Sequence, residues 1–90
     1  MNRRSQASEA VDWHKEANRL LRAEMVRRGV TIEQLAQQLG SMGFVESPKS
    51  LAVKVSRGKF QLAFFLQCMS AMDVDMLTVQ PPRLAVGSGG

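Results

Sequence analysis

Signals that begin and end helices divide this chain into short segments, and they constrain its fold more than any other feature. Thr31 and Gln34 are spaced as in a capping box, and Ser47-Pro48 combines a serine cap with proline at the first helical position. Gly29 and Gly58 follow segments of helical periodicity, where a left-handed glycine ends a helix. The segment after Thr31 is about two turns long, too short to be stable alone, so it must pack on neighbours.

Apolar residues recur at helical spacing in four segments, and we expect a helix in each. The first helix runs from a cap at Ser8 to Gly29, the second ends at Gly40, and the others span residues 48–57 and 61–73. No segment has a convincing strand pattern. The sequence therefore predicts an all-α fold, a compact four- to five-helix bundle containing a helix-turn-helix with a lengthened turn.

Two apolar segments outside these helices are expected to cover the core. Phe44 and Val45 lie in the turn after the second helix, where we expect them to fold back. Residues 75–79 are expected to form one more short helical turn, which brings Met76 and Leu77 onto the core.

The length of 90 residues indicates one domain. We expect a flexible arm over residues 1–7, the helix-turn-helix domain over 8–79, and a disordered tail over 80–90, where Pro81-Pro82 bars helix and glycines follow. The sequence has neither an apolar run of about 18 residues nor a secretory signal, so we expect a cytoplasmic protein without a membrane partner.

Positive charge is concentrated in one part of the chain. Residues 47–72 contain no acidic side chain and four basic ones, Lys49, Lys54, Arg57 and Lys59. Because the whole chain has 12 basic and 8 acidic side chains, this segment accounts for the entire net charge of +4. A clustered positive surface on a small helical domain favours a nucleic-acid partner.

A helical wheel over residues 48–57, stepped by about 100° per residue, separates the segment into two sides. The apolar side contains Leu51, Ala52 and Val55, and the other side contains Lys49, Ser50, Val53, Lys54 and Arg57. Lysine and serine can hydrogen-bond base edges, and valine can contact a thymine methyl group. A merely solvated basic face is the alternative interpretation.

The pattern Leu-Ala-x-x-Leu-Gly at residues 35–40, the ending Arg57-Gly58-Lys59 of the third helix, and residues 64–74 carry a family resemblance. The chain resembles the lambda-repressor-like helix-turn-helix superfamily of bacterial and phage regulators. It is still more similar to an uncharacterised bacterial domain family with the words LRAEM-x-RRGV and SRGKF, matched here by residues 21–31 and 56–68.

This resemblance implies a DNA-binding transcriptional regulator, associated with the nucleoid, that inserts helix 48–57 into the major groove of double-stranded DNA as a homodimer. Its base-reading positions fall on Lys49, Ser50, Val53 and Lys54. Its backbone contacts fall on Arg57 and Lys59, with Thr31 at the start of the second helix, and we expect Arg27 and Arg28 to add phosphate contacts.

The chain departs from the superfamily pattern in two places. Residues 41–47 make the turn several residues longer than usual, and Ile32 stands where relatives often have a glutamine that contacts phosphate. Both departures favour a second hypothesis, a helix-turn-helix-derived protein-interaction module (an adaptor or antirepressor) that uses Met42–Val45 and the Phe60/Phe64 surface. RNA binding is a weaker third option, because no aromatic stacking platform is evident.

The sequence contains few side chains in patterns that indicate catalysis or ligand binding. With one histidine, His14, and one cysteine, Cys68, it contains no metal-ligand cluster, so we expect no metal, no cofactor, no small-molecule ligand and no enzymatic activity. We expect Cys68 to be a buried, reduced thiol. Trp13 either covers the core or contributes to a dimer contact, and Phe60 or Phe64 is available for a partner subunit.

Overall fold

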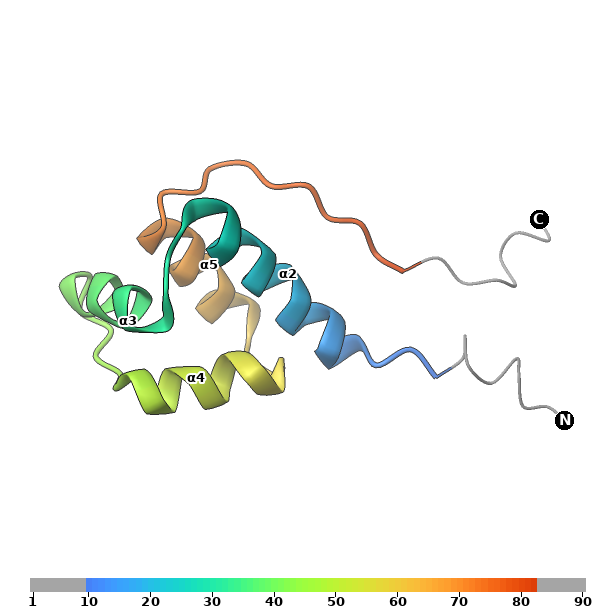
Figure 1. Ribbon diagram of the computed structural model, residues 1–90, viewed down its shortest axis with the longest axis horizontal. Coiled ribbons are helices and arrows are strands. Elements are labelled where there is room, and N and C mark those ends of the chain that lie inside the picture. The colour runs from blue at the N-terminus through green and yellow to red at the C-terminus, as the bar shows by residue number, and fades with distance from the viewer. Residues whose placement is uncertain (1–9, 83–90) are drawn as a thin grey trace, which may run out of the picture.

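The computed structural model describes residues 10–82, and they form four helices (Figure 1). These are α2 (Trp13–Arg28), α3 (Ile32–Ser41), α4 (Pro48–Arg57) and α5 (Leu62–Ala71). The described range contains no strand, so the expected all-α fold is confirmed. Within it, no helix has the length and apolar character needed to cross a membrane. The expected arm over residues 1–7 and most of the expected tail lie outside the described range.

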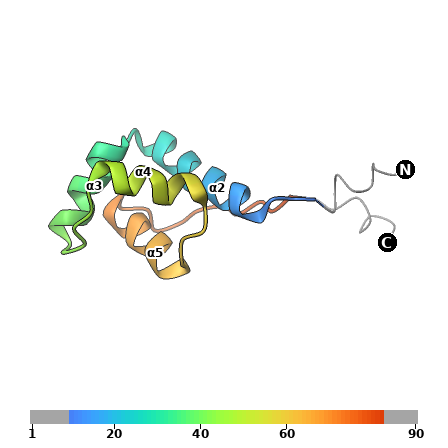
Figure 2. The same cartoon turned by 90° about the horizontal axis from the view of Figure 1, so that it is seen from below.

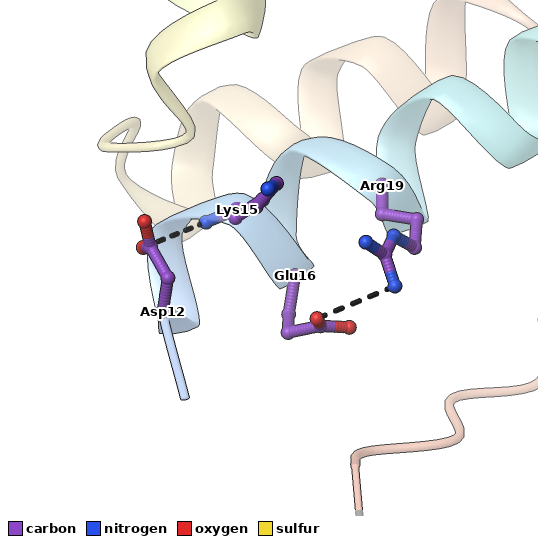
Figure 3. Close-up of polar contacts among 4 residues, drawn as sticks. All are labelled: Asp12, Lys15, Glu16 and Arg19. Carbon is purple, nitrogen blue, oxygen red and sulfur yellow. Dashed lines mark hydrogen bonds and ion pairs between the residues drawn. The ribbon is translucent and has the colours of Figure 1, made fainter. Parts of the chain in front are cut away.

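Side-chain caps fix where three of the helices begin. The Thr31 hydroxyl accepts the N–H of Gln34 while the Gln34 side chain accepts the N–H of Thr31, so the capping box predicted from the sequence is present. Ser47 caps α4 through a 3.1 Å hydrogen bond from the N–H of Ser50, also as predicted. The start of α2 differs from the prediction. Asp12 is the cap and accepts the N–H of Lys15 at 3.1 Å (Figure 3), whereas Ser8 lies outside the described residues.

Left-handed residues end three of the helices by a shared mechanism. Gly29, Gly43 and Asp73 have positive φ angles of 66°, 96° and 59°. In each case the following N–H donates to a carbonyl five residues back, as Phe44 does to Leu39 at 2.9 Å. The prediction that α3 ends at Gly40 was therefore wrong. Gly40 is inside the helix, and Gly43 supplies the left-handed turn that α3 needs to stop.

Each helix buries one stripe of apolar side chains in a common core. The core residues include Leu21 and Met25 of α2, Leu35 and Leu39 of α3, Leu51 and Val55 of α4, and Phe65, Cys68 and Met69 of α5. Helix α4 packs against α2 and α3, and α3 also packs against α5. Figure 2 views the bundle from the side of α4 and shows that no other helix lies over its outer side.

Phe44 and Val45 were expected to fold back onto the core, and this prediction was wrong. Phe44 is 42% exposed and Val45 is 90% exposed. The backbone leaves α3 through the left-handed Gly43 and returns directly to the Ser47 cap, so these two side chains project outward. The lengthened turn therefore presents an apolar surface to solvent.

The conformation of the segment after α5 also differs from the predicted one. Residues 75–79 form no helical turn but run extended beside α2 (Figure 1), with Leu77 partly buried on the core and Met76 82% exposed. The proline at position 81 disfavours helical backbone just before it, which favours the extended path. Trp13 is half-exposed and lines a small hollow with Pro81 and Pro82, so it covers this segment rather than the core.

Candidate functional site

The rotation of α4 is fixed by its buried side. Leu51 and Val55 are fully buried, and they lie one turn apart on the side that faces α2 and α3. The opposite side therefore faces solvent, and it presents Lys49, Ser50, Val53, Lys54 and Arg57, all of them exposed. This is the same division into two sides that the helical wheel predicts.

The outer side of α4 forms one wall of a shallow groove of about 550 Å³. Its lining residues are Glu46, Lys49, Ser50, Val53, Lys54, Arg57, Lys59 and Phe60. The groove thus brings together all four base-facing residues predicted from the sequence and two of the predicted backbone-contacting ones. Four of its lining side chains are cationic and one is acidic, so the groove is suited to an anion.

The C-terminal end of α4 is docked closely on the first turns of α2. Gly58 is buried with φ 66°, and a Cβ atom at this position would lie 1.8 Å from the carbonyl oxygen of His14. Asn18 donates from Nδ2 to the carbonyl oxygen of Val55 at 2.7 Å. Glycine is required here for both its left-handed backbone and the close approach. This contact holds Arg57 and Lys59 in place at one end of the groove.

Lys54 is engaged within the protein. Its Nζ atom lies 2.7 Å from Oε2 of Glu46 and 4.7 Å from the centroid of the Phe64 ring. Lys49, Arg57 and Lys59 have no ion pair with any described residue. The groove therefore contains three uncompensated cations and one that a carboxylate largely neutralises.

Glu46 and Phe60 line the groove but were not predicted from the sequence to do so. Glu46 lies just outside the acid-free segment 47–72 and before the helix cap, which is why composition alone did not include it. Glu46 precedes the cap of α4, so the periodicity of residues 48–57 does not place it, and its pairing with Lys54 is evident only in the structure.

The remaining predicted backbone contacts lie away from the groove. The Thr31 hydroxyl is occupied as a cap acceptor, and Arg28 is exposed at the end of α2. Arg27 pairs with Glu24, which is only 2% exposed, in a separate hollow of about 220 Å³ that includes Thr78 of the C-terminal segment. That segment and α4 lie on opposite sides of α2 (Figure 1). The structure therefore does not bring Thr31, Arg27 and Arg28 together with the α4 groove.

The large apolar side chains in α5 and just before it differ in how far they are exposed to solvent. Phe60 and Phe64, one of which was expected to be available for a partner subunit, are both partly buried against the core, with ring centroids 5.4 Å apart. Leu62 and Leu66 are exposed at 70% and 57%. The exposed apolar positions of α5 are therefore these two leucines, one turn apart.

The buried thiol is unsuited to act as a nucleophile. Burial raises the pKa of Cys68 to about 12, and the nearby Glu46 carboxylate adds to the rise. The thiol therefore stays protonated near neutral pH, whereas the thiolate is the reactive form. Within residues 10–82, no group of three His, Cys, Asp or Glu side chains is positioned to hold a metal ion.

Comparison with known proteins gives one match. Residues 13–77 match the family described as "Domain of unknown function (DUF6471)". The matched range begins at the first residue of α2 and extends past α5, so it contains all four helices and the whole α4 groove. No curated protein and no solved structure matches the chain.

Proposed function

We propose that this chain, which belongs to the DUF6471 family of domains of unknown function, is a transcriptional regulator that binds double-stranded DNA by inserting α4 into the major groove. The observation that carries the proposal is the α4 groove, in which three cations on the outer side of the helix and Lys59 just after it line one surface, while the inner side of the helix is buried in the core. A major groove about 12 Å wide admits one such helix.

The side chains of the groove divide into two functional groups. Lys49 and Ser50, near the start of α4, can donate hydrogen bonds to base acceptors, and the exposed Val53 offers methyl groups to thymine. Arg57 and Lys59 lie at the end that is docked on α2, where a fixed position suits phosphate contacts. The order of α3, turn and α4 matches the helix-turn-helix arrangement, in which the second helix reads the groove.

A salt titration of DNA binding tests this proposal. Three uncompensated cations should give a slope of log affinity against log salt concentration of about −3 on random-sequence duplex. Arg57→Ala should reduce the magnitude of that slope by about one, because one phosphate contact is lost.

Arg19→Ala is the matched control. It removes the same charge from an exposed arginine that pairs with Glu16 at 3.5 Å on the side of α2 facing the C-terminal segment (Figure 3). The control should leave the slope unchanged. Binding that is independent of salt, or an equal effect of the two substitutions, would contradict the proposal.

We also propose that the chain forms a homodimer, which would present two α4 helices to successive major grooves. The exposed Leu62 and Leu66 on α5 support an apolar contact between copies. Leu66→Ser should convert a dimer to a monomer in sedimentation equilibrium while leaving the thermal midpoint of the monomer nearly unchanged. A wild-type chain that remains monomeric at high concentration would contradict this second proposal.

The exposed turn before α4 favours a second candidate function, a protein-interaction module. Phe44 and Val45 form an outward apolar tip next to the groove. The two candidates differ in one measurement. A module of this kind has no need to retard random duplex DNA at low salt, whereas the proposed regulator must.

A further inference from the structure

We propose that Glu46 is a specificity-determining residue of the α4 groove, which selects duplexes that present a base amino group and weakens binding to phosphates alone. The inference rests on the proposed DNA binding and assigns a role within that same site. It starts from an unexpected feature of the groove, a single carboxylate placed among four cations.

Glu46 is held at the N-terminal end of the groove in a defined position. It precedes the Ser47 cap, and its carboxylate reaches along the outer side of α4 to Lys54, with 2.7 Å between Oε2 and Nζ. Lys54 is fixed in turn by the ring of Phe64, 4.7 Å from its ammonium group. The carboxylate is partly exposed and lines the groove, so it is available to a bound molecule.

The charge of Glu46 changes what the groove accepts. A phosphate that approaches Lys54 must come close to the carboxylate, which repels it, so this half of the groove gains little from the sugar–phosphate backbone. At the opposite end, no acidic side chain among the lining residues offsets Arg57 and Lys59. Nonspecific affinity therefore comes from Lys49, Arg57 and Lys59, and Lys54 adds little to it.

The hydrogen-bonding capacity of Glu46 defines what can compensate for that repulsion. An ionised carboxylate has about four acceptor sites, and the contact with Lys54 leaves some of them open to the groove. DNA phosphates have no donors, whereas cytosine and adenine each present an exocyclic amino group in the major groove. A base amino group is thus the partner that the carboxylate recognises, and the selected sequences distinguish cytosine from adenine.

The test compares wild type, Glu46→Ala and Glu16→Gln on random duplex and in selection of bound sequences. Glu16→Gln is the control, since it removes one acidic charge on the other side of α2. Glu46→Ala should bind random duplex more tightly, with a salt slope steeper by about one, because Lys54 becomes available to phosphate. It should also lose about fivefold or more of discrimination at one base position where the wild type prefers cytosine or adenine.

Lys54→Ala separates a direct role of Glu46 from one that acts through Lys54. Under the proposal, this variant binds more weakly but keeps the preference for the amino base. Loss of that preference in Lys54→Ala, or unchanged preference and unchanged random-duplex affinity in Glu46→Ala, would overturn the inference while leaving DNA binding intact. Failure of the folded wild type to bind any duplex at low salt overturns the proposed function itself, and the role of Glu46 with it. Equal thermal midpoints of the variants verify that all are folded.

Discussion

The two ends of α4 are held in different ways. At its C-terminal end, the backbone of Gly58 lies directly against the backbone of α2 at His14, and Asn18 hydrogen-bonds the Val55 carbonyl. At its N-terminal end, α4 is held by its own Ser47 cap and follows a turn whose apolar residues face solvent. At the C-terminal end the backbones of α4 and α2 meet with no spare space, whereas the first turn of α4 depends on its cap and on the burial of Leu51. This difference places the backbone at Arg57 and Gly58 against α2, whereas the first turn of α4 has no such close backbone contact among those described.

Gly58→Ala should have the largest effect on this arrangement. The substitution forces an L-residue into the left-handed region and places a methyl group where the His14 carbonyl lies, so either α2 or α4 must shift. We expect a loss of at least about 3 kcal/mol in the free energy of unfolding, a large share of the roughly 5–15 kcal/mol of a typical domain. Urea denaturation measures this loss.

Substitutions at two other glycines distinguish backbone strain from steric overlap with His14 as the cause of that loss. Gly29 has the same φ of 66° but open space where the methyl group of an alanine would lie. Gly29→Ala should therefore cost only about 1 kcal/mol, which is the strain of the left-handed backbone alone. Gly40 lies in helical backbone with open space, and Gly40→Ala should stabilise α3 by about 0.5–1 kcal/mol. A similar loss at positions 29 and 58 would show that the close approach to His14 is unimportant.

Asn18→Ala tests the second contact at the fixed end. It removes the 2.7 Å hydrogen bond to Val55, which joins residues 37 apart in the sequence. We expect a loss of about 1.5 kcal/mol in the free energy of unfolding. Asn18→Asp is the comparison variant, because it keeps the shape but cannot donate. It should lose at least as much, and full stability in Asn18→Asp would exclude the hydrogen bond as the cause.

Ser47→Ala tests the other end of α4. It removes the cap bond to the N–H of Ser50, and we expect a loss of about 1 kcal/mol. Ser47→Asp retains a capping oxygen and should stay within about 0.5 kcal/mol of the wild type. Chemical denaturation of both variants checks the order. A loss at Ser47 greater than that at Gly58 would reverse the contrast between the two ends.

Helix limits could be predicted from the sequence wherever a local signal determines them. The Thr31 capping box, the Ser47-Pro48 start and the left-handed Gly58 act through bonds within a few residues, and the structure contains all three. Gly40 was wrongly predicted to end α3, because a glycine can lie inside a helix as well as just beyond its end. Only the backbone turn at Gly43 reveals which glycine ends α3.

Contacts between distant segments could not be predicted in the same way. The composition of residues 47–72 and the helical wheel identified six groove residues, since one helix and its immediate continuation carry them. The exposure of Leu62 and Leu66 depends instead on how α5 lies on α3. Likewise, Arg27 was expected to contact phosphate, but in the structure it forms an ion pair with Glu24. Helical periodicity identifies the apolar stripe of a helix, but it does not say how much of that stripe a neighbouring helix covers.

Of these substitutions, Val45→Ser should have the smallest effect on stability. Because the side chain is 90% exposed in the turn before α4, its replacement should change the free energy of unfolding by no more than about 0.5 kcal/mol. Its effect on DNA binding then shows whether the turn before α4 takes part in the contact, without any complication from folding. Unchanged affinity for duplex DNA would assign DNA contact to the cationic side of α4 alone. Weakened affinity, with unchanged stability, would mean that the lengthened turn reaches the DNA as well.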